Sequence, residues 1–252
     1  MFLGTCVYAL INSVILLLMA IGFNLTFGIS GVSNFAYGAF YILSAFVTWM
    51  LINWIGIPYF LSAVLSIVFT AFVGAVMYRF ILIRVRGQVL SEVIATFGIG
   101  LIILEFFRYL GFVGIEYSLP VFIDQSFVIA GTYVDMQRIL IVLFSIVLIL
   151  LLWLFIHHTS IGLAFRGIAQ DERTALTFGI DSDWIAMLSV SIGAGLAAIA
   201  ATVVVPLGTI SVSEGYDVLI NALAVCIIGG LGSTGGVIVA SLVVGFAQRF
   251  TD

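Results

Sequence analysis

The run RILIVLFSIVLILLLWLFIH at residues 138–157 decides the fold class, because it carries no charged side chain between Arg138 and His157. A helix rises about 1.5 Å per residue, so about 20 apolar residues cross the roughly 30 Å hydrocarbon core of a bilayer. Similar apolar runs follow one another along the whole chain. We expect membrane spans at residues 5–27, 32–53, 58–82, 89–112, 138–157 and 183–205, with a broken region at 217–250.

The composition agrees with this pattern, because 63% of the residues are hydrophobic and only 8% are charged. Too little polar surface exists to cover a water-soluble fold, whereas lipid accepts apolar side chains and helices satisfy their own backbone groups. We therefore expect an all-α fold, a polytopic transmembrane helical bundle with about seven to eight membrane segments, including broken or re-entrant helices. Residues 1–252 form a single transmembrane domain in this interpretation.

Several classes of function are excluded by the residue types. The chain has a formal net charge of −4 and no basic tract, so nucleic-acid binding has no electrostatic support. The glycine-rich GGLGSTGG lacks the lysine that a phosphate-binding P-loop requires. His157 and His158 are adjacent and would point about 100° apart on a helix, which is poor geometry for one metal ion. We expect no catalytic residue, no cofactor and no metal site.

Arginine placement indicates the orientation in the membrane. Five arginines lie in two segments that are separated by two spans: Arg79, Arg84, Arg86, Arg166 and Arg173. The positive-inside rule places both segments on the cytoplasmic face. The segment 113–137, with acidic residues such as Glu116, Asp124 and Asp135, then lies outside.

Two carboxylates close to the spans need partners. Glu92 lies within reach of Arg84 or Arg86, and Glu105 is three residues from Arg108 on one helix face. These residues fit interfacial ion pairs better than a proton or ion relay, because a proton-coupled carrier would place a lone carboxylate nearer mid-span.

The segment HHTSIGLAFRGIAQDERTALTFGIDSD at residues 157–183 predicts an amphipathic helix around residues 164–178, ended by a left-handed cap at Gly179. Such a helix could lie on lipid headgroups or dock a cytoplasmic protein. Headgroup-binding helices usually carry more basic residues, so the acidic residues here favour a protein partner. The polar stripe is Arg166, Gln170, Arg173 and Thr177, and the apolar stripe is Phe165, Ile168, Ala169 and Leu176.

This segment resembles the cytoplasmic coupling loop of ABC importer permeases for branched-chain amino acids from bacteria and archaea. That loop reads approximately G-x-A-x-R-A-x-A-x-D/E…A…G-I-(N/D), and here Gly167 replaces the alanine after the arginine. The matching residues are Gly162, Ala164, Arg166, Ala169, Asp171, Glu172, Ala175, Gly179, Ile180 and Asp181.

Two more stretches resemble the same family, in the same order along the chain. FGISGVSNFAYGAFYILSAF, from Phe27, is similar to F-G-x-x-G-x-x-N-F-A-H-G-x-F-x-x-L-G-A-Y, with Tyr37 in place of the histidine. IIGGLGSTGGVIVASLVVGF, from Ile227, is similar to L-G-G-L-G-S-x-x-G-A-x-x-G-G. Family members continue beyond the position of Asp252, so the resemblance implies either a fragment of a longer chain or a shortened permease.

The resemblance implies a permease subunit in the inner or plasma membrane of a bacterium or archaeon, importing branched-chain or hydrophobic amino acids by ATP-coupled alternating access. Its partners would be cytoplasmic ABC ATPase subunits, a second permease subunit or a second copy, and an extracytoplasmic binding protein over residues 113–137 and 214–217. The expected ATPase-coupling residues are Arg166, Gln170, Asp171, Glu172, Arg173 and Gly179.

The glycine-bearing stretches also interrupt apolar runs, and backbone that leaves a helix within a membrane must be buried in protein or line a cavity. Broken helices of this kind line substrate pathways in transporters. Alternatively, the glycines only allow close helix packing. The candidate pathway residues are Asn34, Tyr37, Ser233 and Thr234.

Two alternatives remain open on the sequence. Related permeases carry urea, amides or sugars, so the substrate could belong to one of those classes. The chain could also be an autonomous channel or secondary carrier, which would need no ATPase partner and no docking helix.

Overall fold

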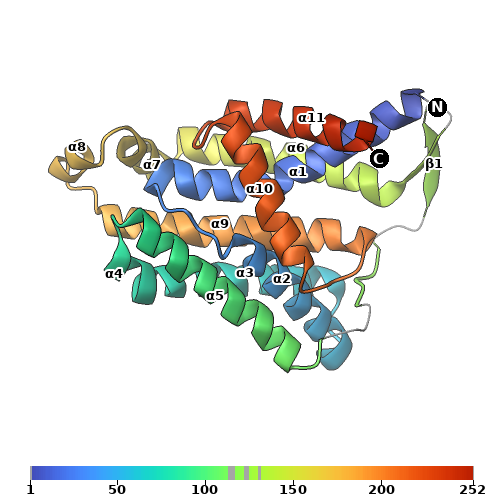
Figure 1. Cartoon of the computed structure of the whole chain (residues 1–252), viewed down its shortest axis with the longest axis horizontal. Coiled ribbons are helices and arrows are strands. Elements are labelled where there is room, and N and C mark those ends of the chain that lie inside the picture. The colour runs from blue at the N-terminus through green and yellow to red at the C-terminus, as the bar shows by residue number, and fades with distance from the viewer. Residues whose placement is uncertain (1, 113–116, 122–124, 130–131, 252) are drawn as a thin grey trace.

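The computed structural model describes residues 2–112, 117–121, 125–129 and 132–251, and Figure 1 shows the whole arrangement. Glu116 and Asp124 lie outside the described residues. The helices are α1 (Phe2–Ser30), α2 (Tyr37–Met50), α3 (Tyr59–Met77), α4 (Ile83–Val85), α5 (Val89–Tyr109), α6 (Met136–His158), α7 (Ser160–Gln170), α8 (Glu172–Thr177), α9 (Ser182–Val204), α10 (Glu214–Gly229) and α11 (Thr234–Thr251). Strands β1 (Ser126–Ile129) and β2 (Thr132–Asp135) pair antiparallel, with Phe127 opposite Val134.

The described residues contain seven helices that are long and apolar enough to cross a membrane. They cover residues 3–30, 37–55, 59–85, 89–109, 136–158, 182–207 and 234–251. The prediction of an all-α, polytopic bundle is therefore confirmed.

Glycines with positive φ interrupt both of the glycine-bearing stretches that the sequence analysis singled out. Gly31 has φ +66°, and the second span begins at Tyr37 rather than at residue 32 as expected, because residues 31–34 leave the helix. Gly230 and Gly232 have φ +85° and +84°, a conformation that residues with a Cβ rarely adopt. The predicted broken region is therefore a pair of helices, α10 of 16 residues and α11 of 18 residues, joined by this turn.

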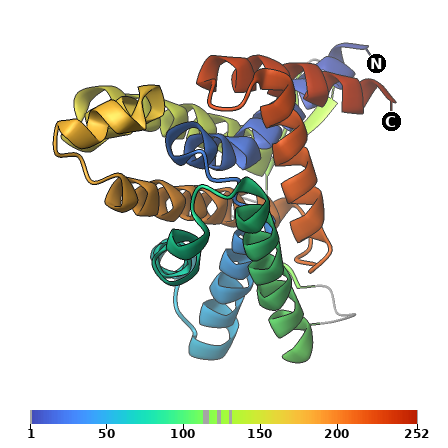
Figure 2. The ribbon, with the colours of Figure 1, turned by 60° about the vertical axis from the view of Figure 1, so that its left-hand side comes forward.

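Helix α9 is the centre of the bundle. It lies between one layer that contains α1, α6 and α11 and another that contains α2, α3 and α5 (Figures 1 and 2). Small residues allow this close approach. A Cβ on Gly193 would lie 2.0 Å from Oγ1 of Thr26 on α1, and a Cβ on Gly74 of α3 would lie 2.7 Å from Cβ of Ala194. At these points α9 therefore packs closely against α1 and α3 through glycine and alanine.

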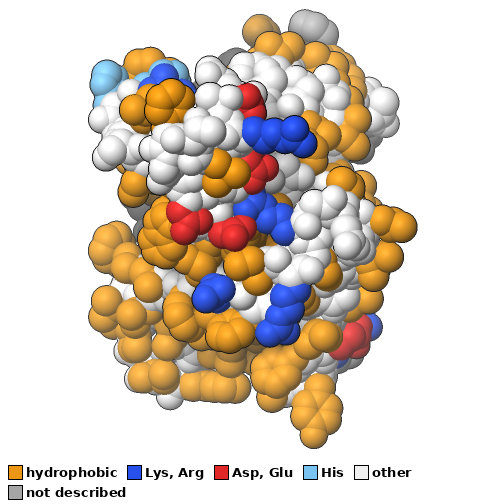
Figure 3. Space-filling model, turned by 90° about the vertical axis from the view of Figure 1, so that its left-hand side faces the viewer, with side chains coloured by type: hydrophobic (Ala, Val, Ile, Leu, Met, Phe, Trp, Pro, Cys, Tyr) orange, Lys and Arg blue, Asp and Glu red, His pale blue; other side chains and the backbone are white. Residues whose placement is uncertain are grey.

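The two ends of the bundle differ in chemistry. The end that holds α4, α7 and α8, here named the α8 end, carries acidic and basic side chains (Figure 3). The opposite end holds an aromatic cluster, in which the rings of Phe46 and Phe107 are 4.7 Å apart and those of Trp49 and Tyr117 are 4.8 Å apart. Aromatic residues concentrate at membrane–water interfaces, so this cluster is consistent with one boundary of the membrane.

Candidate functional site

The segment expected to be one coupling helix is two helices, α7 and α8, which meet at Asp171. Oδ1 of Asp171 accepts a hydrogen bond from the backbone N–H of Arg173 at 3.0 Å, and Oδ2 accepts one from the Thr174 hydroxyl at 2.5 Å. The single-helix prediction is wrong, because an aspartate side chain competes for the backbone N–H groups and starts a new helix instead of continuing the old one.

The Asp171 cap depends on an ionised carboxylate. The hydrogen bond from the Thr174 hydroxyl, together with backbone N–H groups, lowers the pKa of Asp171 below its ordinary value. A carboxylate with a lowered pKa stabilises the folded state at all pH values above its ordinary pKa, and loses that contribution only as the pH falls through the lowered value. The cap is therefore intact at neutral pH.

Helix α8 ends where the sequence predicts. Gly179 has φ +80°, and the N–H of Ile180 donates to the carbonyl of Ala175 at 3.2 Å. The predicted left-handed cap is confirmed. Helix α9 then starts after Asp181, whose Oδ1 accepts from the N–H groups of Asp183 and Trp184.

Helices α7 and α8 have a buried face and an exposed face. Phe165 is fully buried, with its ring 6.0 Å from that of Phe155 on α6, and Ile168 is also buried. Leu163 is 62% exposed, Leu176 52% and Phe178 80%. The predicted apolar stripe is thus divided: Phe165 and Ile168 anchor α7 to the bundle, whereas the structure leaves a second apolar surface uncovered.

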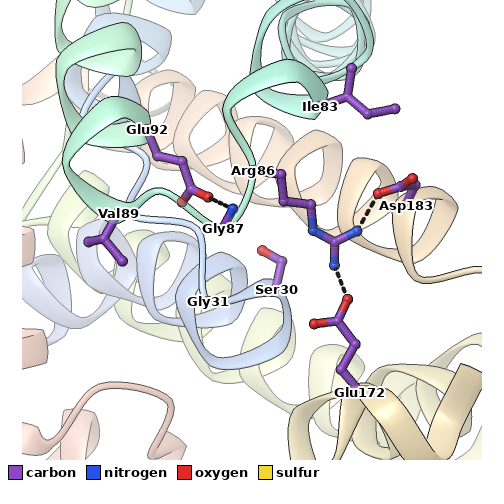
Figure 4. A pocket seen from close by; sticks show the side chains of 9 residues that line it. All are labelled: Ser30, Gly31, Ile83, Arg86, Gly87, Val89, Glu92, Glu172 and Asp183. Carbon is purple, nitrogen blue, oxygen red and sulfur yellow. Dashed lines mark hydrogen bonds and ion pairs between the residues drawn. The ribbon is translucent and has the colours of Figure 1, made fainter.

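Arg86 links this segment to the rest of the bundle (Figure 4). Its Nη2 donates to Oε1 of Glu172 on α8 and to Oγ of Ser182, both at 2.6 Å, and its Nη1 donates to Oδ1 of Asp183 on α9. The Ser182 hydroxyl in turn donates to Glu172. We name these four residues the Arg86 clasp. It joins the loop between α4 and α5 to both α8 and α9.

The positive charge of the Arg86 guanidinium is stabilised by the groups around it. Burial alone would lower the pKa of Arg86, whose side chain is only 17% exposed. Electrostatic interaction with Tyr78, the hydrogen bond to Asp183 and the attraction of Glu172 and Asp183 together outweigh burial, so the pKa of Arg86 is raised above its ordinary value. The expected pairing of Glu92 with Arg84 or Arg86 is wrong for the described residues: Oε1 of Glu92 accepts from the N–H of Gly87 at 2.8 Å instead. The expected pair of Glu105 and Arg108 is confirmed at 2.9 Å.

A polar pocket of about 420 Å³ lies beside the clasp, as Figure 4 shows. Its walls come from the end of α1 at Ser30 and Gly31, from the start of α5 at Val89 and Glu92, and from the clasp itself.

The four candidate pathway residues do not form one site. Asn34 and Tyr37 are buried at the start of α2, whereas Ser233 and Thr234 are exposed at the start of α11, at the α8 end. Oδ1 of Asn34 accepts from the N–H of Ala36 at 3.1 Å, and Oγ of Ser233 accepts from the N–H of Gly236 at 3.1 Å. Each of these two residues therefore shapes the start of a helix.

The packing alternative holds for Gly28 and Gly232, which lie one in each glycine-bearing stretch. A Cβ on Gly28 of α1 would lie 2.7 Å from Cα of Gly232, and the N–H of Gly232 donates to Oδ1 of Asn24 at 2.8 Å. The turn between α10 and α11 is thereby fastened to α1.

Arg86 itself was absent from the predicted site, because its acidic partners lie 86 and 97 residues further along the chain and no spacing rule connects them.

Comparisons with known proteins assign the chain to a family. The family described as "Branched-chain amino acid transport system / permease component" matches residues 5–252. The high-affinity branched-chain amino acid transport system permease protein BraD of Pseudomonas aeruginosa is 29% identical, with 92% of this chain and 80% of BraD covered. The probable branched-chain amino acid transport permease protein LivH of Methanocaldococcus jannaschii is 30% identical, with 95% and 78% covered.

LivH of Escherichia coli K12, a high-affinity branched-chain amino acid transport system permease protein, is 27% identical, with 93% of this chain and 81% of LivH covered. No solved structure matches. The family match covers nearly the whole chain, and the seven apolar helices agree with it. This multi-pass protein of the cell membrane belongs to the family of permease components of branched-chain amino acid transport systems.

Proposed function

We propose that the chain is one permease subunit of an ABC importer that carries branched-chain amino acids into the cell. The names of its relatives support the substrate class and the transport system. In this proposal the energy for uptake comes from a partner that hydrolyses ATP, which is consistent with a family of transport permeases rather than enzymes. The arginines at the α8 end support a cytoplasmic location for that end.

The observation that carries this proposal is the apolar surface of α7 and α8. Leu163, Leu176 and Phe178 are more than half exposed at the end of the bundle that also carries the charged groups. Exposed apolar patches on a water-facing surface mark protein interfaces. Asp171 and Glu172 offset the positive charge that a headgroup-binding helix would need. An ATPase subunit is therefore the partner that fits this surface.

The Arg86 clasp supports a route for the motion. A displacement of α8 by the ATPase acts directly on Arg86 through Glu172, and on α9 through Ser182 and Asp183. Arg86 follows α3 and α4 in the chain, so the same displacement reaches the third span. Because α9 contacts α1, α2 and α3, tilting it would open one end of the bundle while closing the other.

The remaining partners are a second permease subunit, or a second copy of this chain, and a binding protein at the opposite end. Residues 113–137 stay the proposed docking segment for the binding protein. The residues 214–217 also expected there are the first turn of α10, with Gly215 buried against α2, so only exposed Asp217 could contribute to docking.

The α7–α8 surface also separates this function from an autonomous channel or carrier, which has no use for a docking site. Importers of urea, amides or sugars would share the surface. Leucine uptake by proteoliposomes that contain the assembled complex, the binding protein and ATP tests the substrate class directly. Uptake without ATP by the purified chain alone would overturn the proposal.

Leu163→Asp tests the docking surface. Leu163 is 62% exposed, so the carboxylate stays in water and the bundle should assemble normally. At the interface with the ATPase, however, the charge would be buried, and we expect co-purifying ATPase to fall about fivefold or more. Quantitative pull-down through a tag on this chain measures the effect. Leu163→Met is the matched control, because it keeps an apolar side chain. Equal ATPase recovery for the two variants would contradict the assignment of this surface.

A further inference from the structure

The first turns of α2 and α10 cross in direct backbone contact. A Cβ on Gly38 would lie 1.8 Å from the carbonyl oxygen of Gly215, and a Cβ on Gly215 would lie 3.2 Å from the carbonyl oxygen of Gly38. Both helices begin at this crossing, within the bundle, so it lies where two interrupted elements meet. Backbone in such places must be covered by protein or line a pathway.

Two polar groups at the crossing lack partners. Oε2 of Glu214 is buried and has no hydrogen-bond partner among the described residues. The hydroxyl of Tyr41, one turn into α2, is fully buried and likewise accepts or donates no hydrogen bond within the described part of the chain. Tyr41 follows Gly38 by three residues on α2, and Glu214 directly precedes Gly215 on α10, so both residues belong to the helix turns that cross.

Such groups are costly unless something satisfies them. Burying an unpaired carboxylate costs several kcal/mol, and a buried hydroxyl without a hydrogen bond costs about 1–3 kcal/mol. In a membrane protein, an ionisable residue that faces the bundle interior marks a substrate or ion pathway by default. Glu214 offers an acceptor with negative charge, and Tyr41 offers a donor. The walls near them are apolar: Cγ1 of Ile42 and Cδ2 of Leu104 lie 3.0 and 3.2 Å from the Cβ position of Gly215.

An aliphatic amino acid in its zwitterionic form complements these groups. Its ammonium group is a donor with positive charge, its carboxylate is an acceptor, and its side chain is apolar. We propose that Glu214 and Tyr41 bind the transported zwitterion where α2 and α10 cross: the ammonium donates to Glu214, and the Tyr41 hydroxyl donates to the carboxylate. Ile42 and Leu104 contact the aliphatic side chain. This inference rests on the proposed function.

The backbone contact of Gly38 and Gly215 shows how the site is controlled. The crossing is closed in this structure, because the two first turns touch. Separation of α2 from α10 would admit the substrate, and its departure would let the glycines meet again. The crossing therefore serves as both gate and binding site, and residence of the amino acid there is brief.

The test measures binding of tritiated leucine to the assembled importer in nanodiscs, without its binding protein, in nucleotide-free and vanadate-trapped states. The competitors are 4-methylpentanoate, which lacks the ammonium group, and 3-methylbutylamine, which lacks the carboxylate. We expect the wild-type importer to bind leucine saturably in one of the two states. Glu214→Gln should weaken this binding about tenfold or more. Glu105→Gln, in an exposed ion pair with Arg108, is the control and should bind as the wild type does.

The competitors separate recognition from a merely structural role. Glu214→Gln should lose its discrimination against 4-methylpentanoate, and Tyr41→Phe its discrimination against 3-methylbutylamine. If Glu214 and Tyr41 only supported the fold, both substitutions would weaken leucine binding but leave the discrimination against the two competitors unchanged. That result would overturn the inference. So would the absence of saturable binding in both states. If the Glu214→Gln protein does not elute as an assembled complex on size exclusion, the Tyr41→Phe variant alone tests the inference. That substitution removes only one oxygen atom, so it should leave assembly intact.

Uptake distinguishes this inference from the proposed function. A wild-type complex that imports leucine with ATP and binding protein, but whose Glu214→Gln variant imports equally well, would overturn the inference and leave the proposed function standing. A wild-type complex that imports no branched-chain amino acid would overturn both.

Discussion

Gly38→Val eliminates assembled protein in the membrane. The added Cβ would lie 1.8 Å from the carbonyl oxygen of Gly215 and 2.9 Å from its carbonyl carbon. These are backbone atoms, which no rotamer change can move, so α2 and α10 must separate. Overpacking a core typically costs about 1–3 kcal/mol, and a clash with backbone lies above that range. Native proteins are stable by only about 5–15 kcal/mol, so little folded protein should survive.

The measurement is the monodisperse peak of a fluorescently tagged chain on size exclusion, together with its midpoint of thermal unfolding. Gly98→Val on α5 is the matched control, because no atom of the described residues lies within 4 Å of its Cβ position. We expect the control to resemble the wild type. A Gly38→Val protein that elutes and melts like the Gly98→Val protein would show that the crossing is looser than described.

Arg86→Ala uncouples ATP hydrolysis from uptake. The substitution removes donors to Glu172, Ser182 and Asp183 at once. Hydrogen bonds to charged groups are worth about 1.5–3 kcal/mol each, and water replaces part of that here because both carboxylates are about half exposed. The clasp as a whole therefore contributes about 2–4 kcal/mol to holding α8 against the α4–α5 loop. Without it, α8 moves with the ATPase while the third span does not.

We expect uptake near background, with the ATPase still bound and still hydrolysing ATP, in proteoliposomes that contain the complete importer. Arg84→Ala is the matched control, because Arg84 is exposed two residues earlier and takes no part in the clasp. Uptake by Arg86→Ala that equals uptake by Arg84→Ala would remove the clasp from the mechanism. Loss of ATPase binding would instead assign Arg86 to the docking surface.

The sequence correctly predicted features that depend on residues close together in the chain. The apolar runs located six of the seven membrane helices in the described residues to within about five residues, because about 20 apolar residues have no other stable environment. The seventh, at residues 234–251, is only the second half of the region predicted as 217–250. The cap at Gly179 and the pair of Glu105 and Arg108 also depend on neighbours in sequence, and both were predicted correctly. The same reasoning missed the break at Asp171, where the capping preference of one side chain overrode the helical periodicity around it.

The partners of Arg86 and the crossing of α2 with α10 at Gly38 and Gly215 could not be predicted in this way. Glu92 is the acid closest in sequence to Arg86, yet it bonds to the backbone of Gly87. Tyr41 reads as one more apolar residue in an apolar run, and Glu214 as part of an outer loop. A single sequence holds no signal for which acids and bases far apart along the chain will meet.

The sequence by itself determined that the chain spans a membrane many times and, through its coupling segment and glycine motifs, which family it resembles. Hydropathy and local backbone preference depend on residues within one helix, so they can be inferred from consecutive segments of the sequence. Only the tertiary structure decided that Arg86 joins α8 to α9 and that Gly38 meets Gly215. Those contacts depend on how helices distant in sequence pack against one another. That packing is determined by the shapes of all the helices together rather than by any one segment.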